Sequence, residues 1–138
     1  MTTIEAQQLV TAARAASERA YAPYSRFRVG AALLCTGGAT YTGCNVENVS
    51  LGLTMCAERV AVGCAVAAGE RGFRALAIYS EAQEPAPPCG ACRQVLREFA
   101  ADLPIYLAGG SGGWRQVSLA DLYPMPFAPS SLPGPQES

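Results

Sequence analysis

Cys56-Ala57-Glu58 and Pro88-Cys89-Gly90-Ala91-Cys92 are the two stretches around which the rest of the chain is organised. Residues at i and i+3 are neighbours on a helix surface, so Cys89 and Cys92 can give two thiolates to one ion. Cys56 can supply a third thiolate and leave the fourth tetrahedral position to water, as in catalytic zinc sites. Glu58 is close enough in sequence to act on that water without binding the metal. The pattern predicts zinc ligands at Cys56, Cys89 and Cys92 and an acid/base at Glu58.

The composition restricts the class of protein. A chain of 138 residues, half of them hydrophobic, suits a single domain with one sizeable core. Ten basic and eleven acidic residues give a net charge of −1 without a basic cluster, which argues against DNA or RNA as a partner. The sequence has no histidine, which excludes Ser-His-Asp triads, Cys-His dyads and His-ligated metal sites. Thiolates remain as soft ligands, and they select zinc or iron–sulfur chemistry.

The N-terminal stretch has no charged segment followed by an apolar run, and no part of the chain approaches the ~20 apolar residues of a membrane helix. We therefore expect a cytoplasmic protein without a membrane partner, in which the cysteines stay reduced and can bind metal.

Hydrophobic periodicity and turn signals predict a strand–helix–strand–helix–strand order after a first helix. Helices are expected at 2–20, 55–68 and 90–100, with a helical turn at 119–122. Strands are expected at 27–34, 41–46, 74–80, 103–108 and 114–117. The 55–68 helix is nearly all apolar, so it is expected to be buried. This order predicts an α/β fold, a three-layer α/β/α sandwich around a mixed, about five-stranded sheet. The interpretation assigns 1–128 to one catalytic domain and 129–138 to a flexible tail.

A pair of cysteines separated by two residues is a weak signal alone, because a redox pair or a structural zinc knuckle has the same spacing. Cys64 lies eight residues from Cys56 on the same helix, about 12 Å along its axis, so both cannot hold one ion. Cys35 and Cys44 lie in strand patterns. We therefore expect Cys35, Cys44 and Cys64 to be core residues.

Four motifs in order make the chain resemble the small cytidine deaminases from the first helix to Phe127. The matching stretches are Tyr24-Ser25-Arg26-Phe27-Arg28-Val29-Gly30-Ala31-Ala32, Gly43-Cys44-Asn45-Val46-Glu47-Asn48, Cys56-Ala57-Glu58-Arg59 and Pro88-Cys89-Gly90-Ala91-Cys92-Arg93-Gln94-Val95. The glutamate and proline-cysteine signature is also that of zinc deaminases in general.

This resemblance implies zinc-dependent hydrolytic deamination of cytidine and 2'-deoxycytidine to uridine and 2'-deoxyuridine in pyrimidine salvage. It implies one zinc per chain to activate water, with Glu58 carrying the proton to ring nitrogen 3 and then to the departing amine. It also implies contacts to the base from Phe27 and the Ala57 amide, and contacts to the ribose hydroxyls from Asn45 and Glu47. On spacing alone, a core phenylalanine, a turn asparagine and a solvated glutamate would be the preferred interpretations.

Further implications of the resemblance concern charge and assembly. Three thiolates leave excess negative charge on zinc, and Arg59 matches a family arginine that offsets it; otherwise it is an ordinary helix arginine. Phe127 matches a family phenylalanine that reaches into a neighbour's active site within a homotetramer. Leu51 stands where some relatives have an aromatic residue. The alternatives are a zinc deaminase acting on a nucleotide, on tRNA or on an aminonucleoside antibiotic, or a structural zinc or redox module at Cys89 and Cys92.

Overall fold

Five strands form one mixed sheet in the computed structural model, which describes residues 1–134. The strands are β1 (Val29–Cys35), β2 (Thr40–Cys44), β3 (Phe73–Ser80), β4 (Pro104–Ala108) and β5 (Trp114–Ser118). Their order across the sheet is β2-β1-β3-β4-β5. Only β3 and β4 pair in parallel, and the remaining pairs are antiparallel. A parallel pair needs a crossover connection, and here the connection contains a helix.

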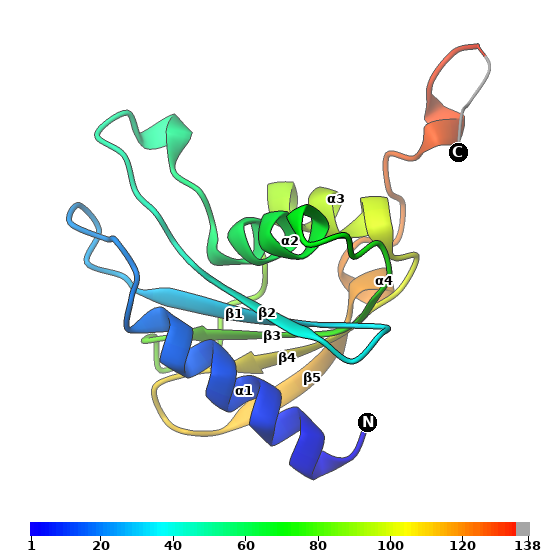
Figure 1. The fold of residues 1–138 in the computed structure, drawn as a ribbon. Coiled ribbons are helices and arrows are strands. Elements are labelled where there is room, and N and C mark those ends of the chain that lie inside the picture. Colours follow the sequence, from blue (N-terminus) through cyan, green and yellow to red (C-terminus); the bar gives the residue numbers. More distant parts are fainter. Residues whose placement is uncertain (135–138) are drawn as a thin grey trace.

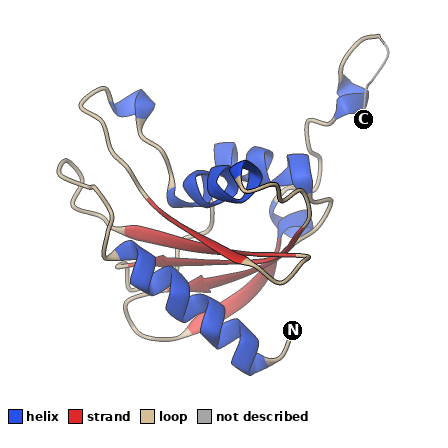
Figure 2. Cartoon of the chain, viewed as in Figure 1, coloured by secondary structure: helices blue, strands red, loops and turns tan. Residues whose placement is uncertain are grey.

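Helices cover both faces of the sheet, as Figure 1 shows. One face carries α1 (Thr3–Ser17), and the other carries α2 (Ala57–Ala67), α3 (Gly90–Phe99) and α4 (Leu119–Leu122). Two short 3₁₀ turns, η1 (Leu51–Leu53) and η2 (Pro129–Ser131), lie outside the layers (Figure 2). This arrangement confirms the predicted three-layer α/β/α sandwich around a mixed, five-stranded sheet.

The central strand β3 is buried almost throughout, and its alternating side chains divide the core in two. Leu76 and Ile78 point to the face covered by α2 and α3. Ala77 and Tyr79 point to the face covered by α1. Helix α2 packs closely on β2 because Gly43 has no side chain at the contact. A Cβ at this position would lie only 2.5 Å from the Ala57 carbonyl oxygen. Strand β2 and the first turn of α2 are therefore in direct backbone contact.

Two of the boundaries that differ from the prediction do so because of one residue, Asn45. The first helix ends at Ser17 and not at residue 20, because the Tyr21 amide donates to the Asn45 carbonyl oxygen (3.0 Å) and draws the chain into an extended bridge. Strand β1 begins at Val29 and not at residue 27. Its entry is bonded to the Asn45 side chain, which accepts from the Val29 amide (2.9 Å) and donates to the Phe27 carbonyl (2.8 Å).

The expectation of a fully buried second helix is also wrong for the single chain. Ala57, Ala61 and Ala65 of α2 face the core, but Gly63 and Cys64 are exposed on its other side. Helix α2 therefore presents a small, uncharged surface away from the sheet.

The end of the chain is tied to α3 before it leaves the body of the molecule. The Arg93 guanidinium donates to the Leu122 carbonyl (2.7 Å), and the Gln94 amide donates to the Phe127 carbonyl (3.0 Å). Beyond that point the segment projects outward to η2 (Figure 1). Part of the expected tail at 129–138, residues 135–138, lies outside the described residues. Among residues 1–134, no helix has the length and apolar character needed to cross a bilayer.

Candidate active site

Three cysteines gather where two helices begin. Cys56 is the N-cap of α2, Cys89 is the N-cap of α3, and Cys92 lies in the first turn of α3. The Cys56 and Cys89 sulfurs are 3.9 Å apart, and the Cys89 and Cys92 sulfurs are 3.4 Å apart. The three sulfurs all lie within 4.8 Å of one another. Cys56 and Cys89 are 33 positions apart along the chain, yet the predicted ligand residues form one cluster.

The N-cap positions leave these sulfurs free to bind a metal. An N-cap side chain usually accepts a hydrogen bond from its own helix, but neither Cys56 nor Cys89 makes one. Their carbonyls still accept the first helical bonds, from Val60 (3.1 Å) and Arg93 (3.0 Å). The Cys56 thiol lies at the positive end of the α2 helix dipole, which favours its thiolate form.

The geometry of the cluster fits zinc. Tetrahedral zinc with Zn–S bonds of ~2.3 Å requires sulfurs ~3.8 Å apart, close to the spacings found here. Three sulfur donors are also the set that selects a soft or borderline metal. A tetrahedral ion at this cluster has one coordination position left for a non-protein ligand.

In the metal-free protein, Cys56 and Cys92 shift each other's pKa in opposite directions. Hydrogen bonding with Cys92, aided by Arg59 and Cys89, lowers the pKa of Cys56 to about 5. The same hydrogen bond, together with burial, raises the pKa of Cys92. Opposite shifts are expected where one proton is shared by two groups. A metal bound by all three sulfurs would displace such protons, so its affinity must rise with pH.

Glu58 lies beside the cluster on the first turn of α2, with only 5% of its surface exposed. Burial, reinforced by the nearby Cys56 thiolate, raises the pKa of Glu58 above that of an ordinary glutamate. A raised pKa makes a carboxylate a stronger proton acceptor than an ordinary glutamate, which suits general acid–base catalysis.

A cavity of about 220 Å³ opens onto these groups. It is lined by twelve residues from β1, α2, β3 and the loops around them: Phe27, Val29, Asn45, Thr54, Cys56, Ala57, Glu58, Ile78, Ser80, Ala86, Pro87 and Cys89. Six residues that the sequence predicted for zinc binding, catalysis or substrate contact line this cavity: Phe27, Asn45, Cys56, Ala57, Glu58 and Cys89. Sequence reasoning did not single out Thr54, Ser80, Ala86 or Pro87. Ser80 was detectable as the polar end of an otherwise apolar strand.

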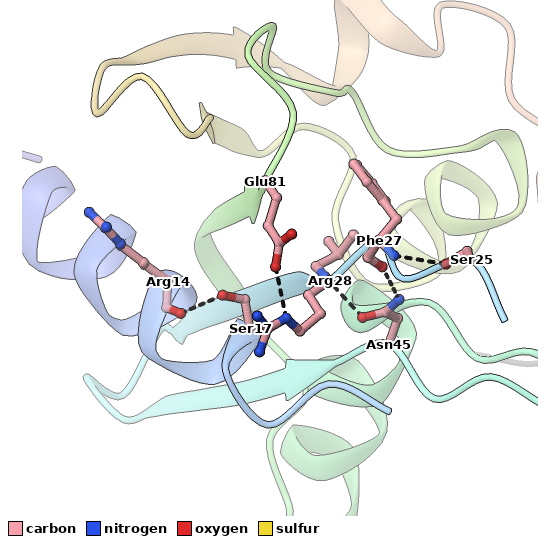
Figure 3. A network of polar contacts seen from close by, with 8 residues as sticks. Arg14, Ser17, Ser25, Phe27, Arg28, Asn45 and Glu81 are labelled. Carbon is pink, nitrogen blue, oxygen red and sulfur yellow. Dashed lines mark hydrogen bonds and ion pairs between the residues drawn. The ribbon is translucent and has the colours of Figure 1, made fainter. Parts of the chain in front are cut away.

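Asn45 (Figure 3) and Glu47 follow β2 and are both hydrogen-bonded to the turn that precedes β1. The Asn45 amide is 7% exposed, and its contacts to Phe27 and Val29 hold the aromatic ring at the cavity. The Glu47 carboxylate accepts from the backbone amides of Tyr24 (3.0 Å) and Ser25 (3.1 Å) and from the Ser25 hydroxyl. These bonds, the Ser25 hydroxyl foremost, lower the pKa of Glu47. About four acceptor positions exist on a carboxylate, so Glu47 keeps one available for a ligand.

Arg59 lies next to the thiols. Its guanidinium donates to the Thr54 carbonyl (3.0 Å) and to the Cys56 sulfur (3.8 Å). The Arg59 Nε is buried and has no hydrogen-bond partner among residues 1–134. The hydrogen bond and charge of Arg59 contribute to the lowered pKa of Cys56.

Phe127 lies away from this cavity, on the projecting C-terminal segment, and 56% of it is exposed. Its backbone amide donates to the Tyr123 hydroxyl (3.0 Å), and that hydroxyl donates to the Gln94 side chain. The backbone at Phe127 is therefore held in place, while the ring is not packed into the core of its own chain.

The remaining cysteines differ from one another. Cys35 is fully buried in the core, as expected, and Cys44 is half-buried. Cys64 is exposed on α2, so its prediction as a core residue is wrong. The periodicity of an all-apolar helix does not show which side faces the sheet. All six cysteines are free thiols.

Three thiols able to hold zinc, beside a buried carboxylate in the wall of a cavity, define a metal-dependent enzyme. The sequence-family model described as "Cytidine and deoxycytidylate deaminase zinc-binding region" matches residues 3–108. The chain belongs to this cytidine deaminase family.

Known proteins extend the similarity over nearly the whole chain. A cytidine deaminase of Sporosarcina psychrophila is 43% identical over 130 residues, covering 94% of this chain and 96% of its own. The crystal structure of cytidine deaminase from Burkholderia pseudomallei superposes with a TM-score of 0.85 at 48% identity, covering 92% of this chain and all of that one. Cytidine deaminase from Mycobacterium tuberculosis gives a TM-score of 0.78 at 42% identity, covering 93% and 99% of the two chains.

Proposed function

We propose that this enzyme hydrolyses the exocyclic amine of cytidine and 2'-deoxycytidine, releasing ammonia with uridine or 2'-deoxyuridine, as a step of pyrimidine salvage. One observation carries the proposal: the buried Glu58 carboxylate and the Cys56 and Cys89 thiols line the same small cavity. The relatives described as cytidine deaminases, which match nearly end to end, support the same substrate class.

Cys56, Cys89 and Cys92 are the proposed ligands of one zinc ion per chain. Zinc bound here supplies a Lewis acid that lowers the pKa of water and prepares it for attack. Glu58 takes the proton from the attacking water, delivers it to ring nitrogen 3 and then assists departure of the amine. The raised pKa of Glu58 supports this two-way role.

The other groups around the cavity bind and orient the nucleoside. Phe27 packs against the base, and the Ala57 amide, at the start of α2, donates to the pyrimidine carbonyl oxygen. Asn45 and Glu47 also hold the 24–29 turn, and they use their remaining hydrogen-bonding positions to bind the ribose hydroxyls. Arg59 offsets the thiolate charge through its contact to Cys56.

An uncharged sugar suits this cavity better than a phosphorylated one. None of the twelve lining residues is an arginine, and the Glu47 carboxylate nearby would repel a phosphate. Nucleosides are therefore preferred over their monophosphates, and nucleic acid is not a substrate.

We further propose a homotetramer with shared active sites, in a reducing, cytoplasmic environment. The exposed Phe127 supports association, and six free thiols support the compartment. Residues 1–128 then form one catalytic domain followed by a tail at 129–138.

A spectrophotometric assay of the zinc-loaded protein tests the function. It compares cytidine, deoxycytidine, their monophosphates and adenosine, and measures zinc per chain in parallel. We expect turnover of both cytosine nucleosides, little turnover of the monophosphates and none of adenosine. Zinc binding with every substrate unchanged would identify a structural zinc module instead.

A further inference from the structure

Ser80 ends the central strand β3 with a hydroxyl that no other described residue satisfies. The side chain is only 1% exposed. Within residues 1–134, its Oγ is one of two buried side-chain nitrogen or oxygen atoms without a hydrogen-bond partner, and the other is Arg59 Nε. Buried hydroxyls in folded proteins are nearly always paired, so an orphaned one requires an explanation.

The position of Ser80 places it in the wall of the active-site cavity. Alternation along β3 puts it on the same face as Leu76 and Ile78, the face covered by α2 and α3. Its register partner on β1 is Val29. Ser80, Ile78 and Val29 line the cavity together with Glu58 and Cys89.

Two other polar groups of this cavity are already engaged within the protein. Asn45 uses both ends of its amide to hold Phe27 and Val29, and the Thr54 carbonyl accepts from Arg59. The Ser80 hydroxyl, by contrast, keeps one donor and two acceptor positions unused.

We propose that the Ser80 hydroxyl accepts a hydrogen bond from the exocyclic amine of the bound base, and so selects pyrimidines that carry this amine. The proposal rests on the proposed cytidine-deaminating function. In that function the ring nitrogen 3 is paired with Glu58 and the carbonyl oxygen with the Ala57 amide. The amine is the polar group of the base with hydrogens left to donate, and Ser80 offers the unused acceptor.

The test changes the enzyme and the ligand in turn. Ser80→Ala should lower kcat/KM for cytidine by about 3- to 10-fold, as expected for one neutral hydrogen bond. A pyrimidin-2-one riboside, identical in sugar and ring but without the amine, should inhibit wild type and Ser80→Ala with constants that differ by less than twofold. Ser17→Ala is the matched control, since that serine is equally buried but donates to the Arg14 carbonyl (2.6 Å) on the α1 side.

The melting temperature of the unliganded, zinc-loaded protein gives a second measurement. Removing an unpaired buried hydroxyl should leave it unchanged or raise it. A clear fall would show that Ser80 is bonded within the protein, and the proposal would be wrong. Equal losses with both ligands, or no loss with cytidine, would also overturn it. Failure of the wild type to deaminate cytidine would instead reject the proposed function.

Discussion

At the residue scale, Glu58 is a buried acidic side chain whose pKa is raised. Charged carboxylates are unfavourable in such a place, and within residues 1–134 the positive charge that acts on this one is Arg59. Placing the Glu58 carboxylate here raises its affinity for a proton and lowers the free energy of unfolding. This is the pattern of a residue retained for reaction and not for stability.

Glu58→Gln keeps the shape of the side chain and removes its acid–base chemistry. We expect turnover of cytidine to fall by at least ~10²-fold, the lower range for a positioned acid or base. Zinc content should stay that of the wild type, and stability at neutral pH should be equal or higher because a buried charge is lost. Steady-state kinetics with metal analysis checks this, and near-normal turnover in the zinc-loaded variant would reject the role of Glu58.

The proposed ligand set makes a second prediction at this scale. Replacing Cys56, Cys89 or Cys92 by Ala should abolish zinc binding and activity together. Cys64→Ser is the matched control, because this exposed thiol lies on the same helix as Cys56 and outside the cluster. It should retain one zinc per chain by elemental analysis. Loss of zinc from Cys64→Ser, with zinc retained in Cys89→Ala, would contradict the set.

At the element scale, the start of α2 is held in place by its contact with β2. A Cβ at Gly43 would lie 2.5 Å from both the Ala57 carbonyl oxygen and the Ala61 amide nitrogen. These are backbone atoms, so the helix itself would have to move. The first turn of α2 carries both Cys56 and Glu58, which links the packing of two elements to the geometry of the site.

Gly43→Ala should therefore destabilise the protein by about 1–3 kcal/mol, as overpacking does. It should also reduce kcat by displacing the first turn of α2. The matched control is Gly63→Ala on the exposed side of the same helix, where a Cβ meets nothing within 4 Å. That change should stabilise by about 0.5–1 kcal/mol and leave kcat unchanged. Equal unfolding free energies and rates for the two variants would contradict this account.

Asp102 stabilises the junction of β5 with α4. It accepts hydrogen bonds from the Ser118 hydroxyl (2.7 Å), the Leu103 amide (2.8 Å) and the Ala120 amide (3.0 Å), and these bonds, Ser118 first, lower its pKa. A lowered folded-state pKa means that the stabilisation is complete above the unfolded value of about 4 and is lost as pH falls through the folded value.

Asp102→Ala should consequently lower the urea midpoint at pH 7, and the deficit should shrink at pH 3. The metal-free forms of the wild type and the variant are compared at both pH values, so that loss of zinc in acid does not affect the urea midpoints. Asp121→Ala, on α4 itself, serves as the control and should shift the midpoint little at either pH. A deficit that grows on acidification would show that the carboxylate bonds are not its source.

At the scale of the whole molecule, the sequence was informative where chemistry and local structure coincide. Cys56 and Cys89 could be placed at helix starts, and the sheet could be inferred from alternating apolar segments. The boundaries near 20 and 27 could not be predicted, because Asn45, distant in sequence, replaces backbone pairing there. The exposed side of α2 and the orphaned Ser80 hydroxyl also depend on which neighbours meet in space, which spacing alone does not encode.

The projecting C-terminal segment raises the question of what Phe127 contacts. A phenylalanine folded onto its own sheet would be buried, a contribution of roughly 1.5–3 kcal/mol. Phe127 is instead 56% exposed, and its backbone is hydrogen-bonded to Gln94 of α3 and to the Tyr123 hydroxyl. A ring that is ordered but unburied in one chain is suited to the active site of a second copy.

Phe127→Ala should then raise KM for cytidine several-fold, while subunit mass and melting temperature change little. Met125→Ala is the control, since this neighbouring side chain is 88% exposed and should affect none of them. Mixed with inactive Glu58→Gln subunits, the Phe127→Ala protein should regain some sites of wild-type KM, because those sites combine its own Glu58 with a partner's Phe127. A sharp fall in melting temperature with unaltered KM, and no recovery on mixing, would place the ring in its own chain's fold and end the shared-site hypothesis.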